Sequence, residues 1–106
     1  NFTRFPDCIS NLRNLTTLRL NDNELTSIPE DIDNLSNLAE LHLEGNELTS
    51  LPESIGNLKN LSYLILRNNE LTKLPVSLGK LTQLERFEWN GNPITVLPPE
   101  LDHLID

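Results

Sequence analysis

The chain has 106 residues and a formal net charge of -8, from 16 acidic and 8 basic residues. This length suits one domain, and the acidic balance argues against nucleic acid or an anionic membrane surface as the partner. The single cysteine, Cys8, excludes a disulfide within the chain, and no apolar run approaches the roughly 20 residues of a membrane span.

The first 14 residues read as the second half of a repeat, with Phe2, Phe5, Pro6, Ile9 and Leu12 in register with later residues. Four full segments of 23 residues follow, at 15–37, 38–60, 61–83 and 84–106. In each, the first, fourth, sixth, eleventh, fourteenth, eighteenth and twenty-first positions are apolar, which makes 28 apolar positions in the four segments. Such a period predicts stacked units that share one hydrophobic core.

A short strand is predicted near the start of each segment, where apolar and polar residues alternate around 18–20, 41–43, 64–66 and 87–89. Alternation is typical of a strand with one buried face. Phe87 and Trp89 take core positions that hold leucine in the other segments, so we interpret them as large core side chains. The alternative is that they are ligand-binding aromatic residues.

An asparagine follows each predicted strand, at Asn23, Asn46, Asn69 and Asn92. Its amide offers two donors and an acceptor for backbone groups that a turn leaves unpaired. The spacing therefore predicts a buried ladder of asparagine side chains.

A Leu-Pro or Ile-Pro pair then recurs with Pro29, Pro52, Pro75 and Pro98. Proline has a fixed φ and no N–H, so it is tolerated at the first position of a helical turn. We expect a short helix or 3₁₀ turn on the outer side of each unit, ended by Gly56 and Gly79 in the second and third segments.

The pattern LxxLxLxxNxLTxLPxxIxxLxx, which covers the whole chain, resembles the leucine-rich repeat family. It is most similar to the 23-residue class with the LPxxI signature, found in intracellular Ras-group proteins and in bacterial repeat proteins. The resemblance implies an α/β repeat solenoid, a right-handed superhelix with a parallel β-sheet on its concave face and 3₁₀, irregular or short helical segments on its convex face. It also implies one domain over residues 1–106 that serves as a scaffold or recognition module in signalling.

No constellation of residues for catalysis is apparent. Cys8, His42 and His103 fall in different units, glycines occur singly, and no metal-ligand spacing is present. We therefore expect no enzymatic activity, no cofactor and no metal, and a protein partner.

The concave face is the predicted binding surface. Tyr63 and Ile65 lie at i and i+2 of the third strand, so both are expected to face outward as apolar anchors. Glu44 and Arg67 are neighbours and are expected to pair with each other. The predicted protein-binding residues are Arg19, Glu40, His42, Glu44, Tyr63, Ile65, Arg67, Arg86 and Glu88.

Three further interpretations remain open. The column Glu24, Glu47 and Glu70, interrupted by Pro93, is either an acidic docking strip or a solvated set of charges. The chain is either an interaction module in its own right, the substrate-recognition arm of a larger signalling enzyme, or part of a secreted, adhesin-like microbial protein. The compartment stays open, with an intracellular location favoured and a secreted microbial protein as the alternative. No polar capping unit is recognisable at either end, which predicts flanking residues or end-to-end self-association.

Overall fold

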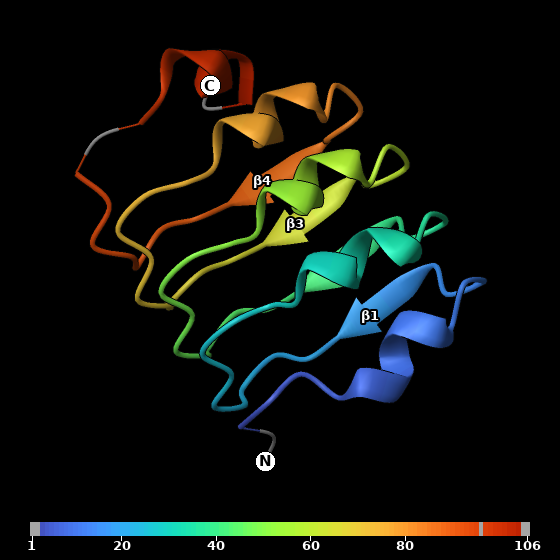
Figure 1. Cartoon of the computed structure of the whole chain (residues 1–106). Helices are drawn as coiled ribbons and strands as arrows, with labels where there is room; N and C mark the ends of the chain where they lie inside the picture. Colours follow the sequence, from blue (N-terminus) through green and yellow to red (C-terminus); the bar gives the residue numbers. More distant parts are fainter. Residues whose placement is uncertain (1–2, 96, 105–106) are drawn as a thin grey trace.

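The computed structural model describes residues 3–95 and 97–104, so Phe2 lies outside the described residues. The chain winds as a solenoid whose successive turns lie side by side (Figure 1). Strands alternate along the chain with 3₁₀ helices (η) in the order η1 (Asp7–Asn11), β1 (Thr17–Arg19), η2 (Glu30–Asn34), β2 (Glu40–His42), η3 (Glu53–Asn57), β3 (Tyr63–Ile65), η4 (Val76–Lys80), β4 (Arg86–Glu88) and η5 (Pro99–Leu104).

The four strands form one parallel sheet in the order β1-β2-β3-β4. Residues that are 23 positions apart are paired, so that Leu18 lies beside Leu41, Leu64 and Phe87 in turn. The strands begin and end one residue before the predicted alternating segments. The pairing nevertheless continues past them, because the N–H of Leu20 donates to the carbonyl of His42 at 2.9 Å. The predicted parallel sheet is confirmed.

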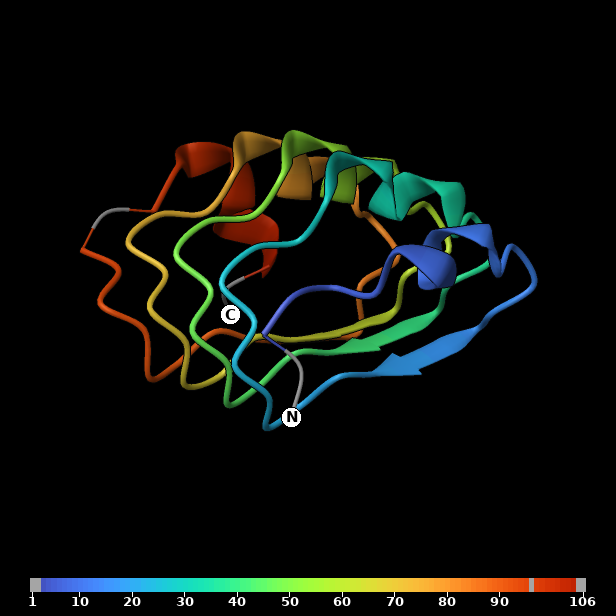
Figure 2. The ribbon, with the colours of Figure 1, turned by 60° about the horizontal axis from the view of Figure 1, so that its bottom comes forward.

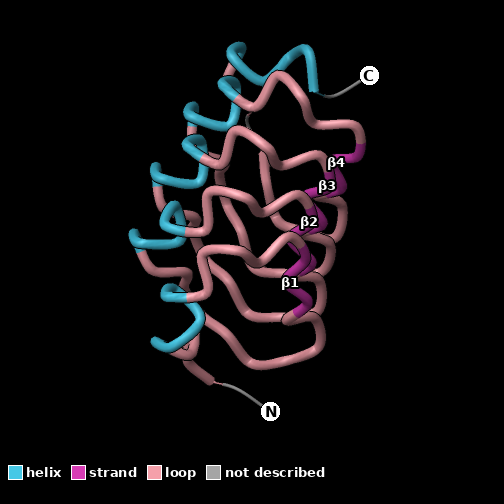
Figure 3. Tube along the Cα trace, turned by 90° about the vertical axis from the view of Figure 1, so that its right-hand side faces the viewer, coloured by secondary structure: helices cyan, strands magenta, loops and turns pink. Residues whose placement is uncertain are grey.

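The sheet and the 3₁₀ helices form two opposite sides of the solenoid. Figure 2 shows the helices in one layer and the strands in another, and Figure 3 shows the same separation from the side. Neighbouring helices stack on one another as the strands do. No helix among the described residues is long and apolar enough to cross a membrane.

A proline precedes each of the helices η1 to η4, with φ between -65 and -71°. The predicted first helical position is off by one residue, because each proline immediately precedes the first residue of its helix. There the carbonyl of Pro52, for example, accepts the first 3₁₀ hydrogen bond from the N–H of Ile55 at 3.1 Å. The ring thus fixes the entry into the helix, and the missing N–H is not needed.

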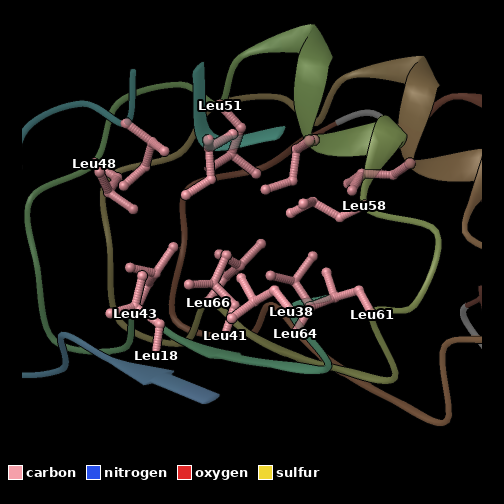
Figure 4. Packing of buried hydrophobic residues seen from close by; sticks show 14 of the residues in the cluster. Leu18, Leu38, Leu41, Leu43, Leu48, Leu51, Leu58, Leu61, Leu64 and Leu66 are labelled. Atoms are coloured by element: carbon pink, nitrogen blue, oxygen red, sulfur yellow. The ribbon is translucent and has the colours of Figure 1, made fainter. Parts of the chain in front are cut away.

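The interior between the two layers is filled by the recurring aliphatic side chains. Leucines from the strand side and from the opposite side face one another across it (Figure 4). Leu41, Leu64, Ile55 and Leu58 are fully buried, as the period predicts. Leu12 is an exception, because 50% of it is exposed even though its counterparts in the next three segments are in the core. No described turn packs against its outer side.

The predicted buried asparagine ladder is confirmed for Asn46 and Asn69. Asn23 and Asn92 are only partly buried, and Asn23 donates to the carbonyls of Leu20 and Asn21 in its own turn. Asn46 donates to the carbonyls of Leu20 and Leu43, both at 2.9 Å, and its Oδ1 accepts from the N–H of Leu25 at 3.1 Å. Asn69 and Asn92 make the equivalent bonds one and two segments later. The amides of Asn46, Asn69 and Asn92 therefore each join two successive turns of the solenoid while satisfying backbone groups that the core hides from water.

Gly56 and Gly79 do not end the outer turns as predicted, since each is the last residue but one of its 3₁₀ helix. Their role is close packing between neighbouring helices. A Cβ on Gly56 would lie 2.6 Å from the Cβ of Ser77 and closer still to the Ser77 carbonyl oxygen, and a Cβ on Gly79 would lie 2.7 Å from the Glu100 carbonyl oxygen. A glycine at this position lets the next helix approach.

The residue that precedes each ladder asparagine has a left-handed backbone. Asp22, Gly45, Asn68 and Gly91 have φ values of 62, 75, 60 and 80°. This conformation favours glycine and, after it, asparagine and aspartate. The Oδ1 of Asp22 occupies the space that a Cβ on Gly45 would need, and the Oδ1 of Asn68 does the same at Gly91.

Candidate functional site

The concave face is the outer surface of the sheet, and it is defined here by three columns of side chains. The first column is Thr17, Glu40, Tyr63 and Arg86, the second is Arg19, His42, Ile65 and Glu88, and the third is Asn21, Glu44, Arg67 and Asn90. The helices lie on the opposite side of the solenoid (Figure 3). The nine predicted binding residues are therefore brought together on one surface.

The first charged cluster on this face centres on Glu40 of β2. Its Oε1 lies 3.2 Å from Nε2 of His42 and 4.0 Å from a guanidinium nitrogen of Arg19. His42 is the more enclosed of the two partners, with 15% of its side chain exposed against 65% for Arg19. An exposed pair such as Arg19 with Glu40 contributes at most about 1 kcal/mol.

The second cluster centres on Glu88 of β4. Its two carboxylate oxygens lie 2.9 Å from Nε of Arg67 and 2.9 Å from a guanidinium nitrogen of Arg86. Arg86 also lies over the ring of Tyr63, with 5.9 Å between the guanidinium carbon and the ring centroid. The hydrogen bond and the negative charge of Glu88 raise the pKa of Arg86 above its ordinary value, so this group stays cationic.

These contacts correct the predicted pairing of Glu44 with Arg67. Arg67 is held by Glu88 on the next strand instead. Oε1 of Glu44 is buried and accepts no hydrogen bond, and its carboxylate forms no ion pair within the part of the chain that the structure describes. Glu88 thus has two arginines beside it and Glu40 has Arg19 and His42, whereas Glu44 has no basic side chain within 4.0 Å among the described residues.

Tyr63 and Ile65 differ in the surface that they offer. Tyr63 is half-buried, but Ile65 is only 4% exposed, although its register beside His42 and Glu88 places it on the concave side. Ile65 therefore presents little apolar surface to a partner. Tyr63 is the accessible aromatic group on this face.

Sequence reasoning missed a groove on another side of the solenoid. It has a volume of about 500 Å³ and is lined mainly by apolar residues, among them Leu74, Pro75, Val76 and Leu97, with Lys73 and Glu53 beside them. Val76 is 50% exposed there. A signal was available, because the residue after the recurring proline changes from glutamate at Glu30 and Glu53 to Val76 and Pro99.

The residues considered for catalysis are not assembled. Cys8 is exposed within η1 and His42 lies in the sheet, while the side chain of His103 lies outside the described residues. Over residues 3–95 and 97–104, no group of three or more histidine, cysteine, aspartate or glutamate side chains is placed to hold a metal ion.

Comparison with known proteins agrees with this geometry. A model of the leucine-rich repeat region matches residues 6–104. The chain belongs to the leucine-rich repeat family. A comparison with curated protein sequences finds no significant match.

Several solved leucine-rich repeat structures are similar. A Leptospira interrogans protein, LIC12759, is 43% identical over 94% of this chain, with a TM-score of 0.90. A chain of the BIR3–SERK2 complex from Arabidopsis thaliana is 36% identical over 92%, with a TM-score of 0.83. The ectodomain of the Arabidopsis thaliana receptor kinase GASSHO1/SCHENGEN3, solved with CASPARIAN STRIP INTEGRITY FACTOR 2, is 33% identical over 95%, with a TM-score of 0.83. This chain spans 26%, 55% and 13% of the length of those three chains.

Proposed function

We propose that this leucine-rich repeat chain is a protein-interaction module that binds its partner through the concave face. The observation that carries the proposal is Tyr63, a half-buried aromatic side chain that lies between Glu40 and Arg86 on a sheet surface of mostly charged and polar side chains. Aromatic and arginine side chains dominate the energetics of protein interfaces. The neighbours solved with protein or peptide partners support the proposal at the level of the family.

We expect Tyr63→Ala combined with Arg86→Ala to weaken partner capture at least about tenfold, because both groups would lose their contacts with the partner. Ile65 is left unchanged, since its burial ties it to stability. Wild-type and variant chains would be used as bait for affinity capture, and the recovered partner would be purified and its Kd measured by calorimetry.

The matched control is Val76→Ala combined with Lys73→Ala, which also removes one apolar and one basic side chain but lies in the groove away from the sheet. This control should bind like wild type. Full binding by the concave variant would refute the proposal, and loss of binding in the control would place the partner in the groove instead. Circular dichroism of both variants checks that they are folded.

We make two further proposals about the organisation of the chain. The chain is a single repeat domain over 1–106 with segments at 15–37, 38–60, 61–83 and 84–106, and it is a member of the 23-residue LPxxI class. We also propose that it is the recognition portion of a longer protein, either a signalling enzyme or a microbial protein exposed to its host, and the partial coverage of the chains that it matches is compatible with this.

End-to-end self-association is a separate proposal that rests on apolar residues at the two ends of the described solenoid. Leu12 is half exposed at one end, and Phe87 and Trp89 are half-buried at the other. We expect the mass measured by light scattering to rise with protein concentration, and Leu12→Ser to reduce that rise. A constant monomer mass for the unaltered chain contradicts the proposal.

A further inference from the structure

The glutamates of the concave face differ in whether a basic side chain lies beside them. The carboxylate of Glu88 lies 2.9 Å from both Arg67 and Arg86, and that of Glu40 lies 4.0 Å from Arg19 and 3.2 Å from His42, so a ligand that binds them must compete with contacts that already exist. The carboxylate of Glu44 has no basic side chain within 4.0 Å among the described residues, because Arg67 pairs with Glu88 instead.

The environment of Glu44 makes it a stronger site for a cation than an ordinary surface glutamate. One of its oxygens is already hidden from solvent without a hydrogen bond. Burying a charged oxygen is costly, and a partner that covers it adds little to that cost. Because Oε1 has already lost its water, a donor that binds the other oxygen of this carboxylate forms a charge-assisted hydrogen bond and displaces less water than it would from a fully solvated glutamate.

Other negative charges near Glu44 also attract a basic ligand over a longer distance. Glu24, Glu47 and Glu70 are exposed and follow the ladder asparagines at the same end of the strands, and no ion pair joins them to a cation within residues 3–95 and 97–104. The whole chain carries a net charge of -8. Such a field steers a basic ligand toward this end of the sheet.

We infer that the partner of the concave face presents a basic segment, with an arginine or lysine that pairs with Glu44. The segment runs past the carboxyl ends of the strands, so that further basic residues face the column Glu24, Glu47 and Glu70. This inference rests on the proposed function, because it names the chemistry of the partner for the same surface. An acidic or an apolar partner is the alternative that the test must distinguish.

The test uses a defined probe, an acetylated and amidated peptide of four Arg-Gly repeats, and the same peptide with citrulline in place of each arginine. Citrulline keeps the shape of the side chain and removes its charge. Binding to the isotope-labelled chain is followed by NMR through the backbone amides of Gly45 and Asn46, at low salt, where screening is weak. We expect the arginine peptide to bind and the citrulline peptide not to bind.

Two substitutions that remove the same charge locate the site. Glu44→Gln should weaken binding of the arginine peptide about tenfold, the loss expected for one charge-assisted hydrogen bond. Glu47→Gln, in the same segment but on the solvated column, should weaken it less than about twofold. Both residues lie outside the hydrophobic core, and the melting temperature of each variant confirms its fold.

In the peptide experiment, any of three results would overturn the inference, namely absent binding of the arginine peptide, equal binding of the citrulline peptide, or equal losses for Glu44→Gln and Glu47→Gln. The last would mean that only the diffuse negative charge attracts the peptide. None of these results touches the proposed function, which fails only if the concave variant retains its captured partner. A captured partner lost by the Tyr63 variant but kept by Glu44→Gln would refute this inference alone.

Discussion

Replacing Asn69 by leucine should destabilise the chain by about 3–5 kcal/mol, although it adds a hydrophobic side chain at a buried position. Asn69 satisfies the N–H of Leu48 and the carbonyls of Leu43 and Leu66, at 2.9 to 3.1 Å. Each backbone group that stays buried without its partner costs about 1–3 kcal/mol. The free energy of unfolding is measured by urea denaturation of the variant and the wild type.

The control for this prediction is Asn90→Leu, the same change of residue at an exposed position on the concave face. It should alter the free energy of unfolding by less than about 0.5 kcal/mol. If the two variants were equally stable, or if Asn69→Leu raised the stability, the ladder would not have the structural role that its hydrogen bonds indicate.

Gly56→Ala is the second substitution for which we expect a large effect, a loss of about 2–3 kcal/mol. Alanine is the better helix former, but its methyl group would lie within 3 Å of three atoms of Ser77, two of them in the backbone. Helices η3 and η4 would have to move apart, which would also loosen the leucines beneath them. Urea denaturation again gives the change in free energy.

Gly79→Ala is the comparison for Gly56→Ala, because it makes the same change at the equivalent position of the next repeat. Its methyl group would come within 3 Å of a single atom, the carbonyl oxygen of Glu100. The gain in helix propensity is the same for both substitutions, so the difference between them isolates the effect of packing. A Gly56→Ala variant as stable as Gly79→Ala would show that neighbouring helices can separate at little cost.

The period of the sequence predicted the fold because every turn of the solenoid places the same residue types at the same positions. An apolar residue in one segment is weak evidence, but the same residue type every 23 positions indicates a shared core, and the pairing of Leu18, Leu41 and Leu64 confirms it. The asparagine ladder was predictable for the same reason. The glycines at Gly56 and Gly79 were misread, because a sequence shows where a glycine lies along the chain but not which neighbour approaches it.

The details of the site depended on side-chain geometry that the period does not contain. Arg67 has glutamates on either side, and the choice of Glu88 over Glu44 depends on rotamers and on the nearby Arg86. Ile65 was correctly placed on the concave side by its register, but its burial depends on how far the side chains beside it extend. Leu12 repeats a core position, yet it lies in the first described turn, and half of it stays exposed even though Phe5 of the same turn is buried.

The left-handed residues at these turns group the repeats in pairs. An acidic or amide side chain at Asp22 and Asn68 leans over the bare backbone of Gly45 and Gly91 in the following turn. If the segment from 38 to 60 were removed, Asn68 would follow Asp22, and its Cβ would compete for the space that the Asp22 carboxylate fills. Removing 46 residues, from 38 to 83, would instead bring Gly91 beside Asp22 and preserve the fit. At this turn, then, the natural increment for lengthening or shortening the protein is two repeats, and a recombination event that respects this step preserves the fit between the left-handed turns.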